Sequence, residues 1–115
     1  MKVLANNTRF FKEEETQWEV VGDGVERQIV GFDDRVMMVN VKFEEGAIGP
    51  LHSHHHTQVT NIAAGTFEVT IEEETRILKK RDSFYIPSNK IHGVVCLEEG
   101  ILIDVFSPMR EDFIK

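Results

Sequence analysis

Short runs of hydrophobic residues, alternating or continuous, follow one another along most of this chain and are separated by Gly, Asp, Asn and Glu. Such runs are typical of β-strands, and little of the 3.6-residue periodicity of a helix follows residue 17. The pattern therefore predicts an all-β domain, with strands at residues 18–21, 25–30, 36–43, 51–56, 58–63, 66–71, 75–79, 83–86, 93–97 and 101–106. The separating residues predict turns at 22–24, 32–34, 46–50, 64–65, 88–89 and 98–100.

So many short strands in a chain of 115 residues predict a sandwich or a closed barrel, because closure removes exposed strand edges. We expect a single domain over residues 1–115, with the barrel at 18–106. Residues 1–17 would form a short helix or an arm packed on a partner subunit, and residues 107–115 a C-terminal tail. Hydrophobic residues make up 41% of the sequence, which is enough for an ordinary core.

Charge and composition narrow the classes of partner. The formal net charge is -7, which argues against binding to a nucleic-acid backbone. No stretch approaches the ~18 continuous apolar residues of a membrane helix, and the first residues lack the apolar run of a signal peptide. A single cysteine, Cys96, cannot form an internal disulfide. We therefore expect a cytoplasmic protein without nucleic-acid or membrane partners.

The histidines fall at two places in the chain. They are His52, His54, His55, His56 and, further on, His92. Since strand side chains alternate between faces, His52, His54 and His56 would share one side of an extended segment, and Gln58 would join them if the strand continues. His55 would face away as a surface or interface residue. Imidazoles together with an oxygen ligand suit a first-row transition metal, so the cluster predicts a metal site.

A carboxylate interrupts the otherwise apolar strand at 101–106. Alternation places Asp104 on the same face as Leu102 and Phe106. A buried, unpaired carboxylate is costly, so Asp104 must be paired, solvated or part of a site. If this face looks into the barrel, Asp104 and Phe106 line the metal-binding cavity. Arg110 would then either pair with Asp104 and pin the tail, or reach an anionic ligand.

Two spaced motifs resemble those of the cupin superfamily. The first, G-x5-H-x-H-x3-E-x6-G, is matched by Gly46, His52, His54, Gln58 and Gly65, with Gln58 in the place of the glutamate. The second, P-x-G-x2-H, is matched from Pro87 to His92, with Asn89 in the place of glycine. The resemblance implies a double-stranded β-helix (jelly-roll) barrel with one divalent transition metal ion (Ni, Zn, Mn, Fe or Co). By position, its ligands are His52, His54, Gln58 and His92.

The end of the chain is similar to one group of small cupins, the pectin-degradation cupins. The similarity lies in D-V-F-S-P-x-R-E-D-F at residues 104–113 and I-P-S-N at residues 86–89. Met109 stands where a second proline is common, and His55-His56-Thr57 replaces the usual Pro-His-Glu. Members of this group open the ring of 4,5-unsaturated monouronates to give the linear 5-keto-4-deoxyuronate.

This resemblance implies an enzyme that acts on a small acidic sugar. Asp104 would shuttle a proton, Arg110 would pair with the substrate carboxylate, and Phe106 would form an apolar wall. Tyr85 and His56 are further candidates for substrate contacts.

Other functions use the same metal cage. A metal-dependent dioxygenase, another sugar isomerase and a non-catalytic cupin that binds a small ligand all remain open. Apolar residues on both faces of the strands at 36–43 and 101–106 favour burial against a second sheet or subunit, and we expect a homodimer.

Overall fold

Antiparallel strands make up most of the computed structural model, which describes residues 8–114. They are β1 Glu19–Gly22, β2 Val25–Phe32, β3 Met37–Phe43, β4 Ile48–His52, β5 Thr57–Ile71, β6 Glu74–Lys79, β7 Ser83–Ile86 and β8 His92–Ser107. Two 3-10 turns flank them, η1 Glu13–Glu15 and η2 Glu111–Phe113. None of the helices within the described part of the chain has the length and hydropathy to span a membrane. The predicted all-β class is confirmed.

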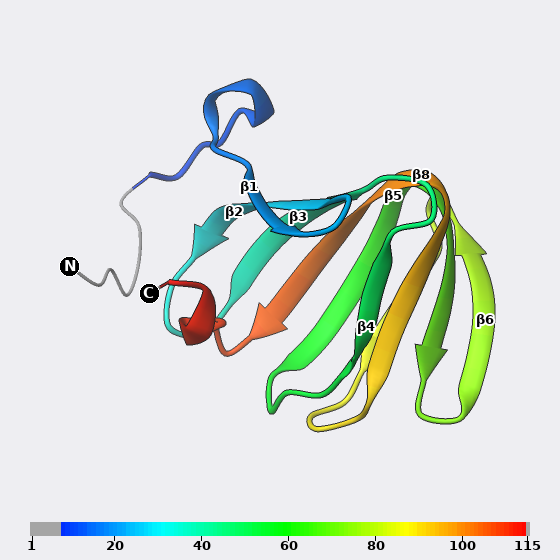
Figure 1. Cartoon of the computed structure of the whole chain (residues 1–115). Coiled ribbons are helices and arrows are strands. Elements are labelled where there is room, and N and C mark those ends of the chain that lie inside the picture. Colours follow the sequence, from blue (N-terminus) through cyan, green and yellow to red (C-terminus); the bar gives the residue numbers. More distant parts are fainter. Residues whose placement is uncertain (1–7, 115) are drawn as a thin grey trace.

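The long strands β5 and β8 connect two facing layers. The strand order is β1-β2-β3-β8-β5-β6, with β4 on β8 and β7 on β5. The second half of β8 pairs with β3 and the first half of β5, whereas its first half pairs with β4 and the second half of β5. Figure 1 shows both strands bending over at one end of the molecule, so that β4 and β6 lie across from β2 and β3.

The predicted turns at 64–65 and 98–100 are wrong, because β5 and β8 continue through them. The register between the two strands shifts here, and the two strands bend together. Gly65 and Gly100 allow the close approach. A Cβ on Gly100 would lie 2.2 Å from the carbonyl oxygen of Ala64, and one on Gly65, which has a φ of +84°, 2.5 Å from that of Glu99. These residues bend paired strands and do not reverse the chain.

The predicted strand at 51–56 is also wrong in its second half. β4 ends at His52, and a loop runs to the start of β5 at Thr57. The carbonyl groups of this loop are bound by the turn before β8: the N–H of Asn89 donates to His54 (2.8 Å) and the hydroxyl of Ser88 to His55 (2.6 Å). Side-chain alternation therefore does not apply to His54, His55 and His56.

The N-terminal segment packs on the barrel of its own chain. The buried amide of Gln28 on β2 donates to the carbonyl oxygens of Glu13 (3.0 Å) and Thr16 (2.9 Å), and Asn40 on β3 donates to its oxygen (2.9 Å). Residues 13–15 of this segment form a 3-10 turn, residues 1–7 lie outside the described part of the chain, and packing on a partner subunit stays a prediction. Apolar side chains from both layers fill the core around the fully buried Phe67 and Val39.

Candidate functional site

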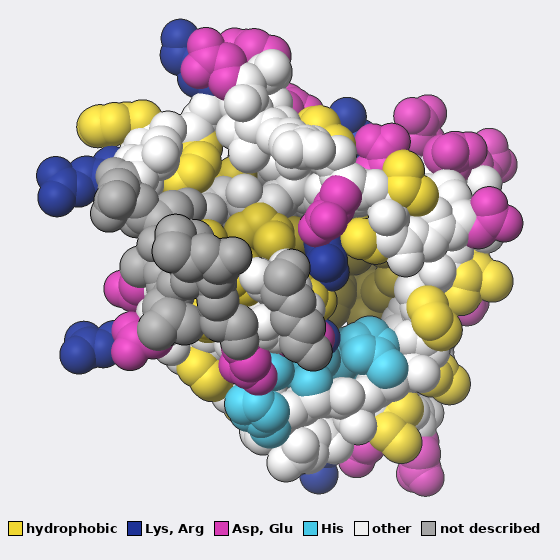
Figure 2. Space-filling model, turned by 60° about the vertical axis from the view of Figure 1, so that its left-hand side comes forward, with side chains coloured by type: hydrophobic (Ala, Val, Ile, Leu, Met, Phe, Trp, Pro, Cys, Tyr) yellow, Lys and Arg dark blue, Asp and Glu magenta, His cyan; other side chains and the backbone are white. Residues whose placement is uncertain are grey.

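A cavity of about 590 Å³ opens between the two layers. Its walls include apolar side chains such as Val69, Leu102 and Phe106. Figure 2 shows histidines gathered along one edge of this hollow, with hydrophobic side chains inside and a basic side chain near its centre. The polar groups in its lining include His52, Gln58, His92, Asp104 and Arg110.

Three histidines converge at the edge of the cavity. His52 ends β4 and His92 begins β8, and the two residues face each other in the β4–β8 pair. His54 reaches them from the loop, so that its ring centroid lies 4.9 Å from that of His92 and 5.6 Å from that of His52. One nitrogen from each ring lies within 4.8 Å of the others. The predicted convergence of these three residues is thus present, although not through strand alternation.

Backbone carbonyls orient the three rings. The Nδ1 atoms of His52, His54 and His92 lie 2.8, 3.1 and 2.9 Å from the carbonyl oxygens of Pro50, His56 and Lys90. Metal-binding imidazoles are commonly held in this way, since an Nδ1–H donor leaves the Nε2 lone pair free. The Nε2 atom of His92 is buried without a hydrogen-bond partner.

Burial also favours the neutral form of the His54 and His92 rings. It lowers the pKa of His54 to about 4, with a further contribution from the charge of Arg110, and it lowers the pKa of His92. A neutral imidazole is the form that binds a metal ion.

Gln58 adds an oxygen to the cluster. Its Oε1 lies 3.0 Å from Nε2 of His54, while its amide nitrogen donates to Thr60 Oγ1 (2.9 Å) and Asp104 Oδ1 (3.3 Å). When Nδ1 of His54 carries the proton, Nε2 and Oε1 are both acceptors. A cation bound between the two atoms would accept a lone pair from each. Adjacent ligand atoms in an octahedral site with bonds of ~2.1 Å lie ~3 Å apart, which matches the separation between these two atoms. The four residues therefore fit a divalent metal ion.

Asp104 lies next to this cluster, on the cavity face of β8. Its Oδ1 accepts from the hydroxyl of Thr60 (2.7 Å) and the amide of Gln58. Burial raises the pKa of Asp104 to about 6, against the opposing effects of Thr60, Arg110 and Gln58. A carboxyl group with a pKa close to neutrality can both accept and release a proton.

Arg110 makes its close ion pair with Asp112 and not with Asp104. Its Nε and Nη2 atoms lie 3.1 and 2.8 Å from the two carboxylate oxygens of Asp112. The guanidinium group also lies 5.0 Å from the ring centre of Phe106 and 4.3 Å from that of Phe113. Of the two alternatives for Arg110, the pair with Asp104 is therefore absent, and the guanidinium group lines the cavity.

Two candidates for substrate contacts lie outside the cavity lining. Tyr85 is 58% exposed and points away, since its neighbour Phe84 on β7 faces the cavity. His56 is buried and lies near Glu111. Residues 53–56 are not a strand, so strand parity does not place His56. Its ring lies beside that of His54, with centroids 5.4 Å apart, and a contact with substrate stays a prediction.

Sequence reasoning missed other residues of the site. Thr60 stands two positions after Gln58 on β5, so alternation could have identified it. Arg27, which lines the cavity and lies 3.7 Å from the ring centre of Phe113, comes from β2 and has no sequence signal.

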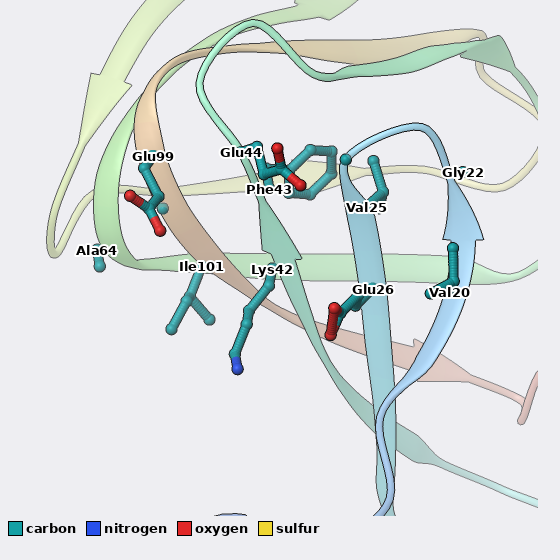
Figure 3. A pocket seen from close by; sticks show the side chains of 12 residues that line it. Val20, Gly22, Val25, Glu26, Lys42, Phe43, Glu44, Ala64, Glu99 and Ile101 are labelled. Carbon is teal, nitrogen blue, oxygen red and sulfur yellow. The ribbon is translucent and has the colours of Figure 1, made fainter.

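A second hollow, of about 500 Å³, lies beside β1, β2 and β3. Figure 3 shows its polar side chains, which include Glu26, Lys42, Glu44 and Glu99. Histidine is absent from the described residues that line it. The histidine-lined cavity is therefore the better candidate for a metal-dependent function.

Comparisons with known proteins agree with this assignment. Residues 39–106 match the cupin domain family. The chain is 53% identical over 108 residues to the pectin degradation protein KdgF of Dickeya dadantii, covering 92% of this chain and 98% of that protein.

Two solved structures are similar over nearly the whole chain. An RmlC-like cupin from Shewanella frigidimarina has a TM-score of 0.94 and 40% identity, covering 97% of this chain and 100% of that one. KdgF from Halomonas sp. has a TM-score of 0.89 and 40% identity, covering 93% and 99%. The predicted double-stranded β-helix barrel is confirmed.

Proposed function

This chain belongs to the cupin family, and we propose that it acts in pectin degradation as a metal-dependent enzyme. The proposed reaction opens the ring of 4,5-unsaturated monouronates to give the linear 5-keto-4-deoxyuronate. The similarity to KdgF supports the process. The observation that carries the reaction is a partly buried carboxyl group, Asp104, with a pKa of about 6 inside a cavity lined also by Arg110 and by members of a metal-type ligand cluster.

The ligand cluster would hold one divalent transition metal ion through His52, His54, Gln58 and His92. When bound, the ion supplies Lewis acidity toward oxygen atoms of the substrate. Gln58 contributes a neutral oxygen where many cupins have a carboxylate, so this ligand set leaves the centre more positively charged.

Asp104 would move the proton. As the C1–O5 bond of the hemiacetal breaks, the carboxylate takes the proton of the C1 hydroxyl, and C1 becomes an aldehyde. O5 leaves as the enolate oxygen on C5, and Asp104 then returns its proton to C4, which converts the enolate to the 5-ketone. The proton count balances without an external oxidant or reductant. The hydrogen bond from Thr60 (2.7 Å) fixes the carboxyl group during both transfers.

Arg110 would bind the substrate carboxylate. Asp112 and the rings of Phe106 and Phe113 hold its guanidinium group in place, which reduces the entropy lost on binding. Phe106 would also provide an apolar surface for the sugar ring. Arg27 also lines the cavity, although its Nε is paired with Glu19 Oε1 at 2.7 Å.

The test is the loss of ultraviolet absorbance from the conjugated double bond of a 4,5-unsaturated galacturonate monomer. We expect fast decay with the metal-loaded protein, and an Asp104→Asn variant slower by about 100-fold or more with its metal content unchanged. Normal turnover by this variant would contradict the role of Asp104. Absence of decay above the spontaneous rate, together with oxygen uptake by the iron-loaded protein, would favour a dioxygenase.

A further inference from the structure

A second group of ligand-type side chains lies where the loop before β5 meets η2. Its members are His55, His56 and Glu111, and one ligand atom of each lies within 4.8 Å of the others. None of the three lines the cavity. We propose that they form a second metal site, for a divalent ion of the zinc class, separate from the cluster around His52.

The distances in this group fit a metal ion better than they fit hydrogen bonds. Oε1 of Glu111 lies 3.5 Å from Nε2 of His56 and 3.6 Å from Nε2 of His55. Hydrogen bonds of this kind are normally 2.7–3.2 Å long. Tetrahedral zinc with bonds of ~2.0–2.1 Å separates its ligand atoms by ~3.3–3.4 Å. The separations from Glu111 to the two histidines therefore match those of zinc ligands to within a few tenths of an ångström.

His56 provides an independent indication of a ligand. It is only 3% exposed, and both of its ring nitrogens are buried without a hydrogen-bond partner. Buried polar atoms are normally paired, and an unpaired one needs an explanation. An ion bound at Nε2 would satisfy the nitrogen that lies toward Glu111.

The two histidines are arranged as a pair. Their rings stack with centroids 3.9 Å apart and planes at 29°, and both Nε2 atoms lie within 3.6 Å of the same carboxylate oxygen. Ser88 holds the backbone of His55, as described above. His55 and Glu111 are 60% and 51% exposed, so an ion can enter from solvent and keep water as a fourth ligand.

Such an ion would join two segments that shape the cavity. The loop carries His54 of the first cluster, and η2 follows Arg110 and ends with Phe113, both of which line the cavity. The second ion would act as a clamp that fixes this C-terminal wall. This inference does not depend on the reaction proposed above.

Zinc stoichiometry tests the proposal. Protein stripped with a chelator is dialysed against buffered Zn²⁺, and bound zinc is measured by mass spectrometry. We expect about two ions per chain for the native protein, about one each for His52→Ala and His55→Ala, and none for the double variant. His55 is mostly exposed, so its replacement should leave the fold intact, which circular dichroism can check.

A second variant tests whether His55→Ala loses zinc only through an indirect effect on the structure. Glu111→Gln should also lose one ion, whereas Glu73→Gln, which removes an exposed carboxylate in the turn between β5 and β6, should lose none. Equal zinc content in the native protein, His55→Ala and Glu111→Gln would overturn the proposal. Loss of an ion in these two variants but not in His52→Ala would support the second site and count against zinc binding at the first.

Discussion

Asp104 makes the protein less stable above neutral pH than an uncharged residue would. Burial raises its pKa from 3.8 to about 6 in the folded protein, whereas in the unfolded chain an aspartate has a pKa near ~3.9. The folded state therefore binds this proton more tightly. The stabilisation that results from binding this proton is fully present below about pH 4 and is lost as the pH rises through about 6.

The variant Asp104→Asn should remove this pH dependence. For the metal-free protein at pH 7.5 we expect the variant to be more stable by about 2–3 kcal/mol, and by much less at pH 4. Urea unfolding at the two pH values measures the difference. An equal gain at both would show that the carboxyl group does not titrate as described. This stability gain and the expected loss of turnover would together identify Asp104 as a residue kept for function.

Gln58 offers a second test at a single position. We expect Gln58→Glu to bind the metal ion more tightly but to turn over about tenfold more slowly. The added negative charge would weaken the Lewis acid and also replace the amide donor to Asp104, 3.3 Å away, with an acceptor. Metal titration and the absorbance assay measure the two effects. Unchanged affinity and turnover would mean that Gln58 only fills space.

The grouping of the candidate metal ligands was predictable from residue spacing, but its geometry was not. The motif resemblance identified His52, His54, Gln58 and His92, which the structure brings together. Strand alternation gave the wrong reason for His54, because the loop conformation depends on hydrogen bonds from Ser88 and Asn89, far along the chain. The hydrophobic periodicity of a segment contains no information about hydrogen bonds from residues far along the chain.

The bends in β5 and β8 determine whether the two layers can face each other. Ala64-Gly65 and Glu98-Glu99-Gly100 have turn composition, so local sequence predicted chain reversals. Only the pairing between the two strands shows that the chain continues, because Gly65 and Gly100 let two backbones approach within a distance that no side chain permits. Most of the other strands were predicted to within a few residues, since each has its own alternating or apolar run.

Replacing Gly100 should therefore be costly. We expect Gly100→Ala to lower the free energy of unfolding by about 2–3 kcal/mol, because its Cβ would lie 2.2 Å from the carbonyl oxygen of Ala64. Gly31→Ala on β2 is the matched control, since the nearest atom to its Cβ is a ring carbon of Phe11 at 3.7 Å. Urea unfolding of the two variants measures the difference. Similar stabilities would mean that the bend adapts easily.

At the scale of the whole molecule, hydrophobic pattern predicted the all-β class, and the motif resemblance predicted the barrel. The order of strands could not be derived from pattern alone, because β3 pairs with β8 across most of the chain. The division into an arm, a barrel and a tail, the cytoplasmic location and the homodimer stay predictions. The first group of candidate metal ligands depends on this topology, since His52, Gln58 and His92 come from three different strands.

A ligand set spread over β4, β5 and β8 couples metal binding to the stability of the barrel. An ion that binds only the folded state, supplied at about 100 times its dissociation constant, stabilises it by about 2.7 kcal/mol. We therefore expect a chelator to lower the melting temperature by several degrees, and His52→Ala to remove the part of this shift that comes from the barrel site. Calorimetric scans of the native protein and of His52→Ala, each with and without Zn²⁺, measure the coupling.

The variant His55→Ala would leave the first cluster intact. The shift in melting temperature that remains in this variant therefore separates the contribution of the barrel site from that of the proposed clamp. A native protein whose melting temperature is the same with and without metal would contradict the coupling, since ligands positioned by three strands cannot bind an ion tightly without favouring the folded state.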